Sequence, residues 1–330
     1  MTQAFQWQGR TDGETQEHLR IHQVINQHAP AKFALIGFAS DEGVRRNKGR
    51  QGAKAGPNAI RSQLAGLPIH QPLAIKDNGT ISCDDGDLEA AQRRLSDELV
   101  ALLSANQKPI VLGGGHEVAF ASFQGLFDYV EQYQAGKTIG IINFDAHFDL
   151  REAPIATSGT PFLQSAMLCQ QYQRPFKYLC LGIADHGNTK VLFDTADTLG
   201  CQYIRDKELA YTKLPQAIEK IKKFIDDVDY LYVTVDLDVF SAAIAPGVSA
   251  PAPKGISTEI FDELFAIIKS SQKIADFDIA ECKPCLEKPY RQTRSLFDLP
   301  IFILIKQHNN STDKYTVSHA VKITYFRAPQ

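Results

Sequence analysis

The sequence has no apolar run approaching the roughly 18 residues that a helix needs to cross a bilayer. Residues 1–27 are polar and of mixed charge, unlike a secretory signal peptide. The six cysteines are scattered through 330 residues, and this spacing is no disulfide framework. These absences predict a cytoplasmic protein with reduced thiols and without membrane contacts.

A strong charge of either sign is also missing. Lys and Arg number 35 against 38 Asp and Glu, which gives a net charge of −3. This balance offers no electrostatic basis for binding nucleic acid or an anionic membrane, so a small molecule is the expected partner. No repeat, linker or change of composition divides the chain. We expect an N-terminal leader with one short helix over residues 1–30 and a single domain over 31–330.

Strand and helix patterns alternate along the whole chain. The segment 39–57, rich in Gly and charge, reads as a loop. Alternation of this kind predicts a single-domain, three-layer α/β/α fold with a mostly parallel sheet. Strands are expected at 33–38, 73–76, 109–112, 139–144, 178–183, 202–204, 230–235, 274–280 and 320–326. Helices are expected after Pro57 and Gly115, and at 87–105, 161–171, 189–199, 215–225, 258–270 and 291–306.

The segment 139–151 carries the strongest chemical signal. Its β-branched residues read as a buried strand, which ends in Asp145, His147 and Asp149. Core packing does not explain three such side chains, because an unpaired buried charge is costly. Alternate residues of an extended chain point the same way, so these three can converge on one point. They predict a metal site, although a strand-end turn followed by a capped helix is the alternative for this segment alone.

Ligand-type residues follow four separate predicted strands. These are His116, the group Asp145, His147 and Asp149, the pair Asp236 and Asp238, and Glu281. Sites of parallel α/β sheets lie at the carboxyl ends of the strands, so all four groups fall where a site is expected. The two histidines and four aspartates are too many for one small cation with an open position. Two metal ions fit better, and an oxygen-rich set without thiolate favours Mn²⁺ over Zn²⁺.

Other motifs in the sequence lack the residues that their chemistry needs. The glycines at 113–115 continue into neither a dinucleotide-binding nor a P-loop pattern, and position 120 is Phe rather than the second His of a zinc-protease helix. Cys282 and Cys285 have CxxC spacing, but there is no second pair for zinc, so we interpret them as structural or merely reactive thiols.

The strand-end motifs resemble those of the ureohydrolases, the family of arginase, agmatinase and formimidoylglutamase. The matching segments are G-G-G-H-E at 113–117, D-A-H-F-D at 145–149, D-L-D at 236–238 and the Glu of D-I-A-E at 278–281. The resemblance covers about residues 33–326 and implies an arginase-like fold with two Mn²⁺ ions. It implies that His116, Asp145, Asp149 and Asp236 bind one ion. It further implies that Asp145, His147, Asp236 and Asp238 bind the other.

The same resemblance implies a reaction and a substrate. Glu281 matches the carboxylate that holds the amidine or guanidine group, while hydroxide bridging the two ions attacks its carbon. The segments at 36–47, 149–151, 158–162 and 245–251 are most similar to the formimidoylglutamase branch, and Phe162 replaces the proton-shuttling His of arginases. This branch hydrolyses N-formimidoyl-L-glutamate to L-glutamate and formamide in histidine breakdown.

The substrate contacts expected on this basis are Arg151, Ser158, Thr160 and Glu281. The cation of Arg151 suits a substrate with two carboxylates, whereas a surface Arg is the alternative interpretation. A ureohydrolase that releases urea from a guanidino acid or a related amine is the nearest competing function, and a non-catalytic metal-binding relative is a third. A homo-oligomer is also expected.

Overall fold

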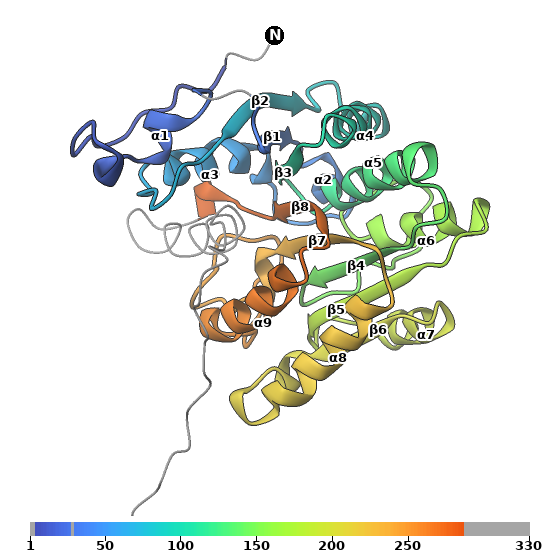
Figure 1. Ribbon diagram of the computed structural model, residues 1–330. Helices are drawn as coiled ribbons and strands as arrows, with labels where there is room; N and C mark the ends of the chain where they lie inside the picture. Colours follow the sequence, from blue (N-terminus) through green and yellow to red (C-terminus); the bar gives the residue numbers. More distant parts are fainter. Residues whose placement is uncertain (1–3, 28–29, 287–330) are drawn as a thin grey trace, which may run out of the picture.

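The computed structural model describes residues 4–27 and 30–286, and within them eight strands form one sheet (Figure 1). Every strand pairing in this sheet is parallel, and the strand order is β2-β1-β3-β8-β7-β4-β5-β6. The strands are β1 (Phe33–Ala39), β2 (Ile75–Ser82), β3 (Lys108–Leu112), β4 (Ile139–Phe144), β5 (Lys177–Ile183), β6 (Gln202–Arg205), β7 (Tyr230–Asp236) and β8 (Ile274–Ala280). The predicted parallel α/β architecture is confirmed.

Helices cover both faces of the sheet and complete the three layers (Figure 1). One face packs against α1 (Ile21–Val24), α3 (Gly56–Ala65), α8 (Leu214–Asp226) and α9 (Thr258–Ser270). The other packs against α4 (Leu88–Ser104), α5 (Val118–Tyr133), α6 (Pro161–Gln171) and α7 (Lys190–Thr198). Side chains alternate between the two cores along a strand, as Tyr232 and Val233 do on β7. None of the described helices combines the length and apolarity needed to cross a membrane.

Two local expectations differ from the structure. The segment predicted as a loop contains a short helix, α2 (Glu42–Arg46), where Glu42 pairs with Arg45 and Arg46 one turn away. The short strand predicted at 73–76 is instead β2, which begins at Ile75 and runs to Ser82 because it pairs along the length of β1. The helix predicted at 291–306 and the strand predicted at 320–326 lie outside the described residues.

Helix α4 begins as the sequence predicts, with Asp87 at its N-cap. The Asp87 carboxylate accepts a hydrogen bond of 3.0 Å from the Ala90 N–H, which would otherwise lack a partner. We therefore expect Asp87→Ala to lower the free energy of unfolding by about 0.5–2 kcal/mol. Urea denaturation checks this, with Asp97→Ala as the control, because Asp97 lies exposed on the same helix. Equal stability of the two variants would contradict the capping role.

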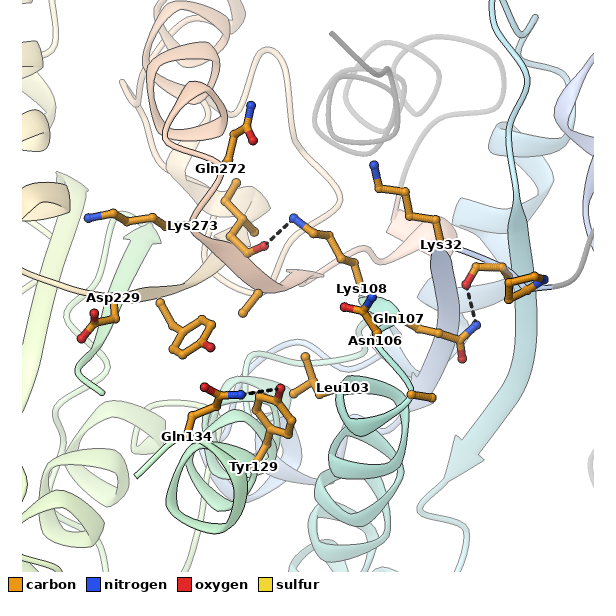
Figure 2. A pocket seen from close by; sticks show the side chains of 16 residues that line it. Lys32, Leu103, Asn106, Gln107, Lys108, Tyr129, Gln134, Asp229, Gln272 and Lys273 are labelled. Atoms are coloured by element: carbon orange, nitrogen blue, oxygen red, sulfur yellow. Dashed lines mark hydrogen bonds between the residues drawn. The ribbon is translucent and has the colours of Figure 1, made fainter. Parts of the chain in front are cut away.

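One pocket lies at the amino ends of the strands and has a volume of about 710 Å³ (Figure 2). Three of its charged groups already have protein partners. The Lys108 ammonium donates to the Ile274 carbonyl at 3.1 Å, and the Lys273 ammonium donates to the Ile225 and Val228 carbonyls at 2.8 Å. The carboxylate of Asp229 is paired with Lys137. The protein therefore already engages these three charged groups.

Candidate metal centre

The predicted metal ligands meet at the carboxyl ends of β3, β7 and β4, and β8, which precedes Glu281, lies between β3 and β7 in the sheet. The turn after β3 supplies His116, and the segment after β4 supplies Asp145, His147 and Asp149. Asp236 ends β7, and Asp238 follows in a short 3-10 helix. Because parallel strands present their carboxyl ends at one edge, residues up to 122 positions apart in the sequence come together there.

Two ligand groups share one carboxylate. His116, Asp145 and Asp149 form the first group, and Asp145, His147 and Asp238 form the second. In the first, the His116 Nδ1 lies 2.9 Å from Asp149 Oδ2 and 3.1 Å from Asp145 Oδ2. In the second, the His147 Nδ1 lies 3.0 Å from Asp238 Oδ2. Asp145 can therefore bridge two metal ions.

Asp236 also faces this centre. Its Oδ2 lies 3.3 Å from the His116 Nδ1, while its Oδ1 accepts a 2.8 Å hydrogen bond from the Asp238 N–H. Backbone donors hold two of the other carboxylates in a similar way, because the His147 N–H donates to Asp145 and the Ala146 N–H donates to Asp238. These bonds orient the carboxylates before any metal binds.

The orientation of the His116 ring indicates a cation in front of Nδ1. The hydroxyl of Thr234 donates to Asp278 Oδ1 at 2.5 Å, so it can only accept from the His116 Nε2–H, 3.1 Å away. The neutral ring then directs the lone pair of Nδ1 at three carboxylate oxygens. That arrangement is repulsive unless a proton or a metal ion lies between them. The donor set therefore fits a metal ion.

The electrostatics of the site lead to the same conclusion. Burial raises the pKa of Asp236, and the neighbouring carboxylates of Asp238 and Asp145 raise it further. Burial alone would lower the pKa of His116, yet its hydrogen bonds to Asp145 and Asp149 and the charges of Asp236 and Asp145 together hold this pKa well above 6.5. Both pKa shifts arise because the buried carboxylates require a positive charge among them. Divalent cations can supply that charge.

Glu281 lies beside the two ligand groups and is 2 % exposed. Its Oε1 accepts from the His116 N–H at 3.3 Å, and its Oε2 accepts from the Ser249 N–H at 3.0 Å. Oε2 also pairs with the ammonium of Lys283, a buried partner that the sequence motifs did not indicate. The backbone of Glu281 has a φ of 70°, a conformation that costs roughly 1–3 kcal/mol for a residue with a side chain.

The other predicted substrate contacts gather on the segment between β4 and α6. The Arg151 side chain is exposed and donates to Asn47 Oδ1 at 3.3 Å, and the Asn47 amide donates to Ser158 Oγ at 3.2 Å. Thr160 is buried, and its hydroxyl bonds within the same segment, to Thr157 and Gln164. The structure thus brings Arg151 and Ser158 together with Asn47, whereas the hydroxyl of Thr160 already has partners in the loop.

Several residues around the centre escaped the sequence analysis. Thr234 and Asn143 each precede a ligand aspartate by two positions on the same strand, so their side chains share its face. Asn143 donates to Asp145 Oδ2 at 3.0 Å. Stepping back two positions along the chain from each of these aspartates would have identified both Thr234 and Asn143. Lys283, two residues after Glu281, has no such signal, because the chain has left the strand.

Comparisons with known proteins agree with this geometry. The model of the arginase family matches residues 31–297. A formimidoylglutamase of Aeromonas salmonicida is 45 % identical over 296 residues, which cover 87 % of this chain and 93 % of that protein. The structure of a Bacillus subtilis formimidoylglutamase matches with a TM-score of 0.75 at 22 % identity, over 86 % of this chain and 91 % of that one. A Trypanosoma cruzi formiminoglutamase solved with Mn²⁺ matches with a TM-score of 0.74 at 23 % identity, over 87 % and 97 %.

Proposed function

This chain belongs to the arginase family, and from that premise we propose that it is a manganese-dependent hydrolase of N-formimidoyl-L-glutamate. The products are L-glutamate and formamide, and the reaction belongs to histidine breakdown. One observation carries the proposal: two ligand groups share Asp145 and lie directly beside the buried carboxylate of Glu281. The names of the relatives at about 45 % identity support the choice of substrate within the family.

The proposed metal ligands divide into two sets. One ion would be held by His116, Asp145, Asp149 and Asp236, and the other by Asp145, His147, Asp236 and Asp238. Five carboxylates at this site, less the one ammonium of Lys283, leave four negative charges, which two divalent ions would balance. When bound, such a pair of ions supplies a nucleophile from water at neutral pH and stabilises developing negative charge.

Two side chains of the site have the roles of binding the substrate and of excluding water. Glu281 faces the amidine nitrogen of the substrate through Oε1, because Oε2 already has two donors. Phe162 is fully buried and packs edge-on against the His116 ring, with the ring centroids 5.5 Å apart. It closes the α6 side of the centre with an apolar group, which keeps bulk water from the first ligand.

Arg151 is the proposed contact for a substrate carboxylate. No carboxylate in the described part of the chain pairs with its guanidinium, whereas Arg45 pairs with Glu42, and Arg46 pairs with Glu42 and Glu89. The backbone fixes Arg151, since its N–H donates to the Gly159 carbonyl at 2.9 Å. Asn47 and Ser158 add polar groups to the same place, and Thr160 shapes the loop that carries Ser158.

We expect Arg151→Ala to lower kcat/KM on formimidoylglutamate by about tenfold or more, a loss of at least ~1.4 kcal/mol in transition-state binding. Metal content should stay at the wild-type level, and Arg151→Lys should recover only part of the loss, because lysine lacks the planar fork. The matched control is Arg45→Ala, an exposed arginine that pairs with Glu42. An equal loss on an analogue without one carboxylate would make Arg151 a structural residue.

A small substrate panel tests the function itself. The Mn²⁺-loaded protein is assayed with formimidoylglutamate, a guanidino acid, agmatine and arginine, and both formamide and urea are measured. Formamide from the first substrate alone is the expected result. Urea from any of the others would replace the proposal with a ureohydrolase activity, and no product from any substrate would favour a non-catalytic relative.

A further inference from the structure

Lys283 is a fully buried lysine at the candidate site. It lies two residues past Glu281, and its side chain is 0 % exposed. Lysine is almost never fully buried unless its charge is paired. Here the ammonium contacts Glu281 Oε2, and the Lys283 backbone N–H donates to the Gly247 carbonyl at 2.8 Å. Hydrogen bonds thus hold both the backbone N–H and the ammonium group of Lys283.

The contacts of Glu281 divide unequally between its two oxygens. Oε2 accepts from the Lys283 ammonium and from the Ser249 N–H, so both of its lone-pair positions are used. Among the residues that the structure describes, Oε1 accepts only from the His116 N–H, which leaves one position. A bidentate contact, in which both oxygens accept from a substrate amidine, is therefore prevented because Oε2 has no acceptor position left. A single contact through Oε1 remains possible.

We propose that Lys283 is a positioning residue that fixes Oε2 of Glu281, so that Oε1 alone presents its remaining acceptor position to a substrate nitrogen. This proposal rests on the proposed function for the identity of that nitrogen. The Lys283 contact also balances the charge of Glu281 before any substrate arrives. Lys283 therefore acts through Glu281 rather than by touching the reacting atoms.

A competing role is a gate, in which Lys283 blocks Glu281 and leaves when the substrate binds. The burial of Lys283 argues against it. If the ammonium left Glu281, it would become an unpaired charge inside the protein, and breaking a buried pair is strongly unfavourable. The backbone bond to Gly247 and the Ser249 contact with the same oxygen also hold this corner of the site in place.

The test is a double-mutant cycle in the full-length, Mn²⁺-loaded protein, with the substrate that the wild type accepts. Lys283→Met is expected to lower kcat/KM by at least tenfold with unchanged metal content, and Lys283→Arg should restore part of it. In a Glu281→Gln background, Lys283→Met should cause no further loss, because the residue that it positions has already lost its charge. Lys190→Met is the matched control, since Lys190 forms an exposed ion pair with Asp194.

Wild-type kinetics in Lys283→Met would overturn the proposal, and so would losses that add in the double variant. If Lys283→Met does not fold, Lys283→Gln replaces it, because it keeps a donor but removes the charge. If the wild type hydrolyses no member of the panel, the proposed function fails, but the same cycle read by urea denaturation still tests the pair. Lys283→Met should then destabilise the wild-type protein more than it destabilises the Glu281→Gln variant, and equal effects would disprove the coupling.

Discussion

Replacing Asp145 by Ala is expected to abolish metal binding and activity together. Asp145 belongs to both ligand groups, with one oxygen 3.1 Å from the His116 Nδ1 and the other 3.6 Å from the His147 Nδ1. Its loss removes a ligand from each ion, so the effect should exceed the roughly 10- to 100-fold loss that follows from changing an outer partner of a ligand. Metal analysis after dialysis, with the substrate assay beside it, measures both quantities.

The metal-free variant should nevertheless fold. In the wild type without metal, Asp145 adds to the repulsion that raises the pKa of Asp236, but against the effect of burial its own pKa is held below the usual range by hydrogen bonds with His116 and His147. Because removing Asp145 relieves one interaction and loses the other, we expect the apo form of Asp145→Ala to keep a cooperative thermal unfolding transition. Asp185→Ala is the control, because Asp185 is half exposed and pairs with Arg205 and Lys207. Retention of two ions by Asp145→Ala, or full wild-type activity after chelation, would refute the dinuclear centre.

The convergence of the candidate ligand residues could be predicted from the sequence because local rules determine where they lie. A buried strand that ends in alternating ligand-type residues puts them on one face, and a parallel sheet puts all such strand ends at one edge. What the sequence could not predict is the strand order that makes β3, β8, β7 and β4 neighbours. That order depends on how helices of both layers pack, which is a property of the whole domain.

Segments governed by long-range contacts were harder to predict. Residues 42–46 read as loop because Gly and charge dominate them, yet they form α2. Hydrogen bonds from Arg45 and Arg46 lower the pKa of Glu42 to about 2, and Arg46 also reaches Glu89, 43 residues away. Such distant contacts, together with the burial of Gly43 and Val44, explain why a short helix is stable here, since isolated short helices are marginal in water.

The partners of the ligands were likewise hidden by distance in the sequence. His116 and Thr234 are separated by 118 positions, and both Thr234 and Asp278 are residues that a strand commonly contains. Asn47 was part of a resemblance to one branch of the family, but its contact with Ser158 spans 111 positions. Residue type alone could not assign these side chains to the site.

Glu281→Gln is expected to lower kcat/KM by about 30-fold to several thousandfold while metal content stays near the wild-type level. The range corresponds to roughly 2–5 kcal/mol, the cost of removing one partner of a buried, hydrogen-bonded charge pair. Gln keeps the shape of the side chain, but its amide has one acceptor oxygen where the carboxylate has two. It cannot accept from Ser249, His116 and Lys283 together without turning its NH₂ group toward one of these donors.

The matched variant for this test is Glu117→Gln, because Glu117 is a second buried carboxyl group beside His116. Burial, followed by the charge of Glu281, raises the pKa of Glu117 to about 7, so much of its charge is already lost at neutral pH. One of its oxygens accepts from Ser40 and Gly43, and the other has no partner among the described residues. Its replacement should therefore cost less than tenfold in kcat/KM. If both variants keep their metal and lose activity equally, or if Glu281→Gln retains wild-type kcat/KM, Glu281 does not bind the substrate.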